Sequence, residues 1–524
     1  MGLFLALQAP GQAPAPNDAD DSTVGRILLV LPFDNRSGQP SLEWIREAAA
    51  ELLSRRFASA GFSPMSREDR LYALDHLGLP EGFQPSRASS LKLAQTLDAD
   101  SIVVGSFQTD GTTIEAEARV VDVPHLRMSA PVTARGQMRD LIDVFDSLAW
   151  RLTREMDPGF NVAEGTFVAA GKGLRLDAFE QYIRGITEPD QGERLRHLQQ
   201  AVKLSPDLSS AWMALGREDY SGQQYEEAAE AFAKVDRSDP DALEAGFYRG
   251  LSLLFSGNYT PAETAFSGVA RVLPLAEVLN NQGVAISRQG HDGIALFRAA
   301  VAADPNAADY HFNLAVSLKR HGETSQALTE ITECLKLRPN DSEAEGLLAA
   351  WKGTVSATAA TDPGATSDPL ERIVRNFDAA AFRQAALMMD QMEASRLAAL
   401  SPHDRALKLT SQAKEYLDRG LVLESERLYQ SAVEADATLA QAHAGLAEVR
   451  ERTGDAAGSR KEAQAALALE PSAEAYVVLG RLDFDANHLD EAGKEAGEAL
   501  RLDPQSRSAQ ELNRQIESKA GQKQ

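Results

Sequence analysis

Cysteine, histidine and aromatic side chains are scarce in this chain of 524 residues. The single cysteine, Cys334, excludes an intramolecular disulfide, and its apolar helical surroundings, ITECLKL, favour packing over a role as a nucleophile. The nine histidines are scattered, with neither an H-E-x-x-H motif nor a Cys/His cluster. We therefore expect no metal site. An aromatic content of 6%, with much Ala, Leu and Glu, leans towards helix.

Basic side chains are in the minority, and long apolar runs are missing. The 77 acidic and 53 basic residues give a formal net charge of -24, which repels polyanions and argues against nucleic acid as a partner. No apolar run reaches the roughly 20 residues that a transmembrane helix needs. The sequence predicts a chain that does not span a membrane.

Motifs of catalysis are also lacking. The stretch GTFVAAGKG, residues 165–173, comes nearest to a phosphate-binding loop. Its spacing is one residue too long, and Gly173 stands where a magnesium-binding Ser or Thr is required, so we interpret it as a linker. No G-x-S-x-G motif occurs, and no G-x-G-x-x-G follows a strand. We predict no catalytic residues, no cofactor-binding residues and no metal ligands.

The first 23 residues differ from the rest of the chain. Residues 3–7 form an apolar run followed by Ala, Gln and Pro, which resembles the end of a signal peptide. The run is short, and no Lys or Arg precedes Arg26. We expect residues 1–23 to be the remnant of an export signal that begins upstream. A disordered cytoplasmic tail is the alternative.

Residues 24–158 combine strand and helix patterns. The run RILLVLPFDNRSG (26–38) reads as a buried strand that enters a turn, and a long amphipathic helix follows it. Two strand-like runs flank Asp110-Gly111, a hairpin turn, and a further helix closes the region. This order predicts a compact α/β domain.

A repeat dominates the sequence from residue 177 onwards. In residues 211–240, small Gly216 and Ala228 lie where two antiparallel helices approach, large Trp212 and Phe232 fill the space between them, and Pro240 ends the unit. The frame recurs about every 34 residues and gives eight copies, five and then three. Its small and large positions include Gly185, Leu198, Gly250, Phe266, Gly283, Phe297, Ala315, Ala327, Ala413, Tyr429, Ala447, Ala466, Gly480 and Ala492.

These positions divide the repeats into two arrays. Array 1 is predicted over 177–351, and array 2 with a capping helix over 406–519. Between them, 352–369 is small, polar and Pro-containing, which indicates a mobile linker. Residues 370–405 read as a degenerate helical hairpin whose methionines, among them Met388 and Met392, fill a core.

Two resemblances to known families follow from these motifs. The repeat is similar to the tetratricopeptide repeat, a helix-turn-helix unit. The motifs VLPFDN and LAQTLDADSIVVGSF, before the hairpin, resemble those of the TolB amino-terminal-like domain. Together they imply an α/β domain followed by an all-α tetratricopeptide superhelix, in a protein that binds partners.

Resemblance to superhelical repeat proteins also suggests site residues. In those proteins an Asn two residues before the small Gly or Ala faces the concave groove and hydrogen-bonds the backbone of a bound peptide. Asn281 and Asn313 occupy that position here. Basic residues on or beside the same face are candidates to select a carboxylate; they are Arg217, Arg288, Lys319 and Arg320.

The sequence therefore favours a non-enzymatic scaffold that captures proteins or peptides on the concave surface of its repeats. The resemblances and the N-terminus favour the periplasm or cell envelope. A cytoplasmic regulator with an N-terminal sensing domain is the alternative, and an enzyme is a third. Cofactors are not expected.

Overall fold

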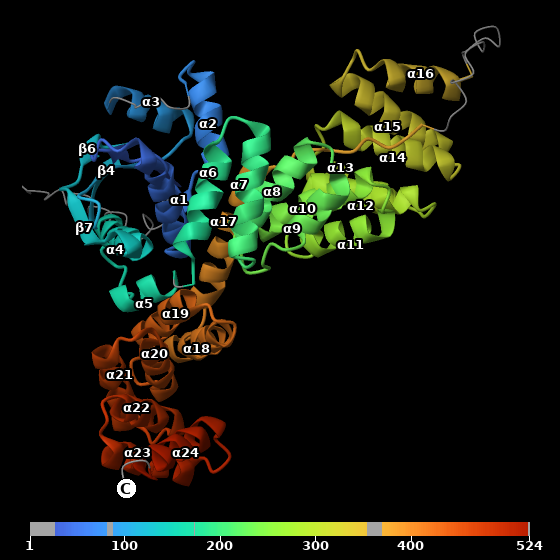
Figure 1. The fold of residues 1–524 in the computed structure, drawn as a ribbon. Helices are drawn as coiled ribbons and strands as arrows, with labels where there is room; N and C mark the ends of the chain where they lie inside the picture. The colour runs from blue at the N-terminus through green and yellow to red at the C-terminus, as the bar shows by residue number, and fades with distance from the viewer. Residues whose placement is uncertain (1–26, 81–86, 172, 354–368, 522–524) are drawn as a thin grey trace, which may run out of the picture. The chain divides into compact units, whose positions relative to one another are not determined.

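The computed structural model describes residues 27–80, 87–171, 173–353 and 369–521 (Figure 1). Within these residues the chain forms two compact units. Unit 1 combines the described parts of Met1–Lys172 and Ala406–Gln524, and unit 2 is Gly173–Arg405. The predicted export remnant, 1–23, lies outside the described residues.

Unit 1 begins with an α/β domain on a mixed sheet. β1 pairs in parallel with β3 and β4, β2 pairs in parallel with β4, and β5 is antiparallel to β4, β6 and β7. Leu28, Leu29 and Val30 of β1 are at most 2% exposed, as expected for a strand covered on both faces. The strands of the described residues are β1 (Ile27–Val30), β2 (Asp34–Asn35), β3 (Ser63–Pro64), β4 (Ser101–Thr109), β5 (Thr113–Asp122), β6 (Arg127–Met128) and β7 (Val132–Gln137).

Helices cover this sheet. α4 packs against α1, β5 and β7, whereas Leu29, Leu31 and Ile102 form an apolar cluster with residues of α2 and α3. The predicted hairpin turn is present, with Gly111 at a φ of 94°. The described helices are η2 (Pro40–Leu42), α1 (Trp44–Ser59), α2 (Arg67–His76), α3 (Arg87–Thr96), η3 (Met138–Asp140) and α4 (Leu141–Met156). The expected α/β arrangement is therefore found.

A short helix, α5 (Glu164–Ala169), packs on the second array within unit 1. The hydroxyl groups of Thr166 and Thr453 lie 2.9 Å apart, and the Gln430 side chain donates to the Asn161 carbonyl at 3.0 Å. Most of the GTFVAAGKG stretch is thus helical and part of a packed contact. The linker interpretation was wrong here, because Phe167 is fully buried.

Array 2 consists of three helical hairpins and a closing helix. Its helices are α18 (Pro402–Asp418), α19 (Val422–Ala435), α20 (Ala440–Thr453), α21 (Ala456–Leu469), α22 (Ala473–Asp485), α23 (Leu489–Leu502) and α24 (Arg507–Gly521). α24 packs on α22 and α23. It covers the apolar end of the stack.

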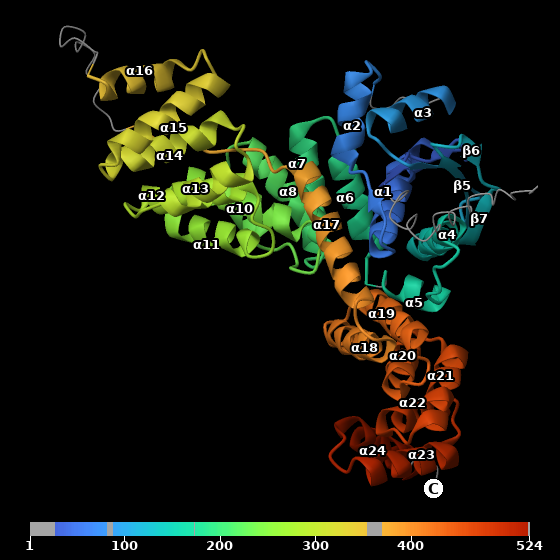
Figure 2. The same cartoon turned by 180° about the vertical axis from the view of Figure 1, so that it is seen from behind.

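Array 1, in unit 2, has five hairpins followed by α16 and by one further helix, α17 (Figure 2). The helices are α6 (Leu176–Thr187), α7 (Gln191–Leu204), α8 (Ser209–Ser221), α9 (Tyr225–Phe232), α10 (Ala242–Phe255), α11 (Tyr259–Ala270), α12 (Ala276–Arg288), α13 (Ile294–Ala303), α14 (Ala308–Arg320), α15 (Thr324–Leu337), α16 (Ser342–Trp351) and α17 (Ala379–Ala398). The first helices of the last three hairpins are α10, α12 and α14.

The repeated glycines lie where the two helices of a hairpin cross. A Cβ atom at these positions would overlap the ring of a phenylalanine on the second helix, so only glycine allows the close approach. The pairs are Gly216 with Phe232 at 2.8 Å, Gly250 with Phe266 at 2.7 Å and Gly283 with Phe297 at 2.8 Å. This confirms the packing that the repeat predicts.

A large side chain with a ring or amide nitrogen, on the first helix of a hairpin or on the closing helix α24, forms a second recurrent contact. It bonds the carbonyl six residues earlier, in the turn between hairpins. The contacts are Trp212 to Pro206 at 2.8 Å, His311 to Pro305 at 3.0 Å, His443 to Ala437 at 3.2 Å and Gln510 to Pro504 at 2.8 Å. Both histidines therefore serve hairpin packing.

The predicted hairpin over 370–405 was wrong. Residues 369–378 are extended, and a single helix, α17, follows them. The backbone of 369–378 bonds side chains of array 1 in place of its own helical turns, so tertiary contacts override local helix propensity. Met388 and Met392 are 53% and 54% exposed rather than in a core. Most of the predicted linker, 354–368, lies outside the described residues.

Candidate functional site

The extended residues 369–378, PLERIVRNFD, lie against array 1, and we call them the docked segment. They appear as the orange trace before α17 in Figures 1 and 2. Their contacts come from α10, α12, α14 and the start of α16, which we call the receptor face. Three of these are first helices of consecutive hairpins, so the chain itself covers the surface that sequence analysis predicted for peptides.

Two asparagines hold the backbone of the docked segment. The Asn281 side chain donates to the Val374 carbonyl at 2.7 Å and accepts the N–H of Val374 at 3.0 Å. Asn313 makes the same pair of bonds to Arg372, at 2.7 and 2.6 Å. Both side chains are fully buried. Because an amide offers a donor and an acceptor side by side, each asparagine matches the N–H and C=O of one peptide residue, whatever the side chain of that residue.

Asn280 and Glu277 extend this backbone recognition, and sequence reasoning missed both. Asn280 donates to the Arg372 carbonyl at 3.2 Å and accepts from Asn313 at 2.8 Å, which fixes the Asn313 amide. Glu277 accepts the backbone N–H of Asp378 at 3.0 Å. The adjacent amides in LNNQG were the signal for Asn280. Helical periodicity alone places Asn280 about 100° away from Asn281.

A cationic subsite surrounds Glu371 of the docked segment. Glu371 is 3% exposed, and its carboxylate contacts Arg320 and accepts from the Ser287 hydroxyl. Arg288 lies 3.3 Å from the same carboxylate and donates to the Glu371 carbonyl at 3.1 Å. A buried carboxylate costs several kcal/mol unless it is paired, so the two guanidinium groups make this burial possible.

An anionic subsite lies beside it and holds Arg372. The guanidinium bonds Asp341 at 2.6 and 2.8 Å, Asp309 at 3.0 Å and Glu343 at 2.9 Å. It also stacks 3.6 Å from the centre of the Phe312 ring. The hydrogen bonds from Arg372 lower the pKa of Asp341 to about 2. Burial disfavours charged Arg372, but the three carboxylates outweigh it and raise the Arg372 pKa.

Apolar side chains anchor the other half of the docked segment. Ile373 and Phe377 pack against the core cluster formed by α10 to α15. The Phe377 ring centre lies 5.5 Å from that of Phe247. Arg375 is exposed and lies 5.0 Å from the ring centre of Phe255. The segment thus combines a backbone clamp, two charged subsites and an aromatic anchor.

Four of the six predicted site residues meet at this segment: Asn281, Asn313, Arg288 and Arg320. The structure places the other two in different contacts. Arg217 donates to Glu244 on the next first helix at 2.7 Å. Lys319 donates to the Thr324 hydroxyl at 3.2 Å and lies 5.9 Å from the Trp351 ring centre.

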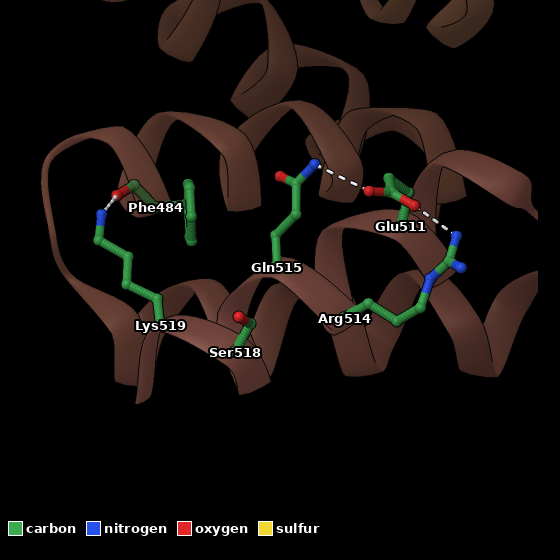
Figure 3. A pocket seen from close by; sticks show the side chains of 6 residues that line it. All are labelled: Phe484, Glu511, Arg514, Gln515, Ser518 and Lys519. Atoms are coloured by element: carbon green, nitrogen blue, oxygen red, sulfur yellow. Dashed lines mark hydrogen bonds and ion pairs between the residues drawn. The ribbon is translucent and has the colours of Figure 1, made fainter. Parts of the chain in front are cut away.

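An open pocket of 560 Å³ lies at the end of array 2 (Figure 3). Lys519 donates to the Phe484 carbonyl at 3.2 Å and covers the Phe484 ring, while Glu511 bonds both Gln515 and Arg514. The polar lining groups thus bond one another and do not converge on a ligand position. The lining residues are Phe484, Glu511, Arg514, Gln515, Ser518 and Lys519.

Reactive groups are few in the part of the chain that the structure describes. No cluster of three or more His, Cys, Asp or Glu side chains there could hold a metal ion. Burial raises the pKa of Cys334 to about 11, so the thiol stays protonated at neutral pH. Within the same residues, every helix is too short or too polar to cross a membrane.

Comparisons with known proteins bear on the repeats. No curated protein sequence matches the chain. Similar solved structures include MamA from Desulfovibrio magneticus RS-1, at 23% identity over 32% of this chain and 96% of that one, with a TM-score of 0.29. YrrB, a TPR protein with an unusual peptide-binding site, is 16% identical over 40% of this chain and 100% of that one, with a TM-score of 0.29. The LpoB C-terminal domain from Salmonella enterica is 21% identical over 23% of this chain and 88% of that one, with a TM-score of 0.21.

A family model for the tetratricopeptide repeat matches residues 213–274 and 287–342. The matched residues lie between α8 and the start of α16 and include α10 and α14 of the receptor face, whereas most of α12, with Asn281, falls between the two matched stretches. The match agrees with the helical hairpins and with their glycine crossings. Residues 213–274 and 287–342 therefore match tetratricopeptide repeats, and the docked segment contacts helices of this region.

Proposed function

We propose that the chain is a non-enzymatic scaffold that binds protein partners by holding extended peptides on the receptor face of array 1. The observation that supports this proposal is the pair of buried asparagines, Asn281 and Asn313, which hold alternate residues of an extended chain. A surface that binds one extended segment through its backbone has the groups needed to bind another.

The receptor face suits this role because it is built on helices. Asn281 lies on α12, which is fixed by the crossing of Gly283 with Phe297, and Asn313 lies on α14, whose Ala315 packs in a core with Ile331 of α15. Little side-chain freedom is therefore lost when a peptide arrives. We propose that the stacked hairpins form a superhelix with this face on its concave side. The net charge of -24 makes a protein or peptide the expected partner rather than nucleic acid.

A peptide library tests the proposal directly. An array of random ten-residue peptides is probed with three forms of the full chain, each of which carries Phe377→Ala to weaken the docked segment: this form alone, the form with Asn281→Ala and Asn313→Ala added, and the control with Asn306→Ala added. Asn306 is an exposed amide of the same array. We expect the control to bind the same peptides as the Phe377→Ala form, and the form that lacks both asparagines to lose at least tenfold in signal. Equal binding by the form that lacks both asparagines would remove the receptor face from the proposal.

We also propose a place for the N-terminal domain. Its resemblance to the TolB amino-terminal-like domain, together with the apolar run at 3–7, supports a protein of the bacterial cell envelope or periplasm. Fractionation of cells that make the chain from its natural genomic frame tests this. Recovery of the protein in the cytoplasm would instead support a regulator in which the N-terminal domain senses a ligand and the repeats relay it.

A further inference from the structure

We propose that the receptor face selects peptides with the chemistry of its own docked segment: an acidic residue, then arginine, then an aliphatic residue, and phenylalanine four positions after that. Until such a partner displaces it, the docked segment occupies the face in cis. This inference rests on the proposed function and names the class of partner.

Charge sets the first part of this selection. Arg288 and Arg320 form a cationic subsite for Glu371, and Asp309 and Asp341 form an anionic subsite for the next residue, Arg372. Successive side chains of an extended chain point to opposite sides, so one peptide meets both subsites. A peptide with the two charges exchanged would put like charges together in both, which is strongly unfavourable.

The apolar anchors set the second part. Ile373 and Phe377 pack on the cluster that contains Phe247, with three residues between them. The intervening Arg375 and Asn376 are exposed, as is Leu370, which is 58% exposed. The requirement therefore falls on four side chains, while neighbouring positions remain free to vary. In protein interfaces a few buried residues usually supply most of the binding free energy, and the contacts around them contribute little.

The docked segment is joined to α16 through residues 352–368 of the same chain. A covalent link of this kind gives an effective concentration in the millimolar range for short connections. A free peptide of the same sequence competes with the docked segment at that effective concentration. Its apparent Kd is its intrinsic Kd divided by the fraction of chains whose receptor face is open. Wild-type chain is thus expected to bind such a peptide poorly, and a chain with a weakened segment to bind it well.

The array should keep its fold when the segment leaves. The glycine crossings of its hairpins, Gly250 with Phe266 and Gly283 with Phe297, lie between helices of array 1 and not against the docked segment. A released receptor face exposes asparagines and charged side chains, which water can solvate. Displacement therefore uncovers these polar groups and the apolar patch around Phe247 on which Ile373 and Phe377 pack, but it leaves the glycine crossings in place.

The test uses a fluorescein-labelled peptide, PLERIVRNFD, and fluorescence polarisation with the full-length chain. In the unmasked variant, Glu371→Ala, Arg372→Ala and Phe377→Ala weaken the docked segment and leave the receptor face intact. Asn376→Ala, an exposed position of the segment, is the matched control. We expect the unmasked variant to bind the peptide at least tenfold more tightly than the wild type and the control. A second peptide, PLREIVRNFD, should bind it at least tenfold more weakly.

The outcomes separate this inference from the proposed function. Equal binding of both peptides to the unmasked variant would overturn the selectivity and leave general peptide binding in place. Binding of neither peptide by a variant with wild-type circular dichroism would refute peptide binding itself. If the triple variant loses helicity, the single variants Phe377→Ala and Arg372→Ala replace it. Wild-type affinity equal to theirs, or a dimer in light scattering that the unmasked variant lacks, would refute occupancy in cis.

Discussion

Replacing Arg372 with methionine should release the docked segment from the receptor face. The guanidinium makes two bonds to Asp341, which is 6% exposed in its side chain, and stacks on Phe312. Hydrogen bonds to charged groups contribute about 1.5–3 kcal/mol. Asp309 and Glu343 add little, because their side chains are 31% and 52% exposed. We expect docking to weaken by about 2–3 kcal/mol, which is a factor of about 30–150.

Hydrogen–deuterium exchange measures this change in the full chain. The amides of residues 372, 374 and 378 are bonded by the receptor face, so their exchange reports the docking equilibrium. Peptides that cover 369–378 should exchange about 30–150 times faster in Arg372→Met, with the β4–β5 hairpin unchanged. Asn376→Ala should match the wild type. Unchanged protection, or a loss that extends over all of array 1, would contradict the role assigned to Arg372.

Three further experiments test the glycine crossings, the burial of Cys334 and the ion pair of His443. Gly250→Ala should destabilise array 1 by about 1–3 kcal/mol through overlap with the phenylalanine of α11, whereas Gly268→Ala, which meets open space, should be neutral or stabilising; thermal unfolding distinguishes them. Cys334 should resist alkylation at pH 8 until the chain unfolds, and rapid labelling of folded protein would contradict its burial. A hydrogen bond with a carboxylate of α21 raises the pKa of His443, so its contribution, about 1 kcal/mol, is complete below about pH 6.5 and lost as pH rises through the raised value. His443→Gln should therefore increase hydrogen exchange of α20 and α21 at pH 6 and have little effect at pH 9.

Local patterns predicted most of the fold. Gly216 and Gly250 indicate helix crossings, because a Cβ atom at either position would overlap a phenylalanine ring of the second helix. Small residues at this position recur at a fixed period along the sequence. The docked segment escaped prediction because LERIVRNF has ordinary helix-forming residues. Its extended form depends on Asn281 and Asn313, about 60–90 positions away, which supply the hydrogen bonds that a helix would have made internally. Such a contact has no local signature.

Some residues of the candidate site could likewise be predicted from the sequence, and others could not. Asn281 and Arg288 could be selected because the repeat fixes which positions share a face. Asp309 and Asp341 could not, since they are two among 77 acidic residues and most carboxylates of such a chain are solvated. The packing of α5 on array 2 was also out of reach. Thr166 and Thr453 are far apart in sequence, and threonine pairs carry no pattern.

The contact between α5 and array 2 imposes an order on synthesis. The two halves of unit 1 are separated in the chain by the whole of unit 2, so the ribosome must make residues 173–405 before α5 can meet α19 and α20. At about 5–20 residues per second this wait is roughly 10–50 s. During that interval Phe167 has no array 2 beside its helix, and a chain that stops before residue 406 would never supply one. Premature termination before residue 406 is therefore expected to affect the first third of the protein.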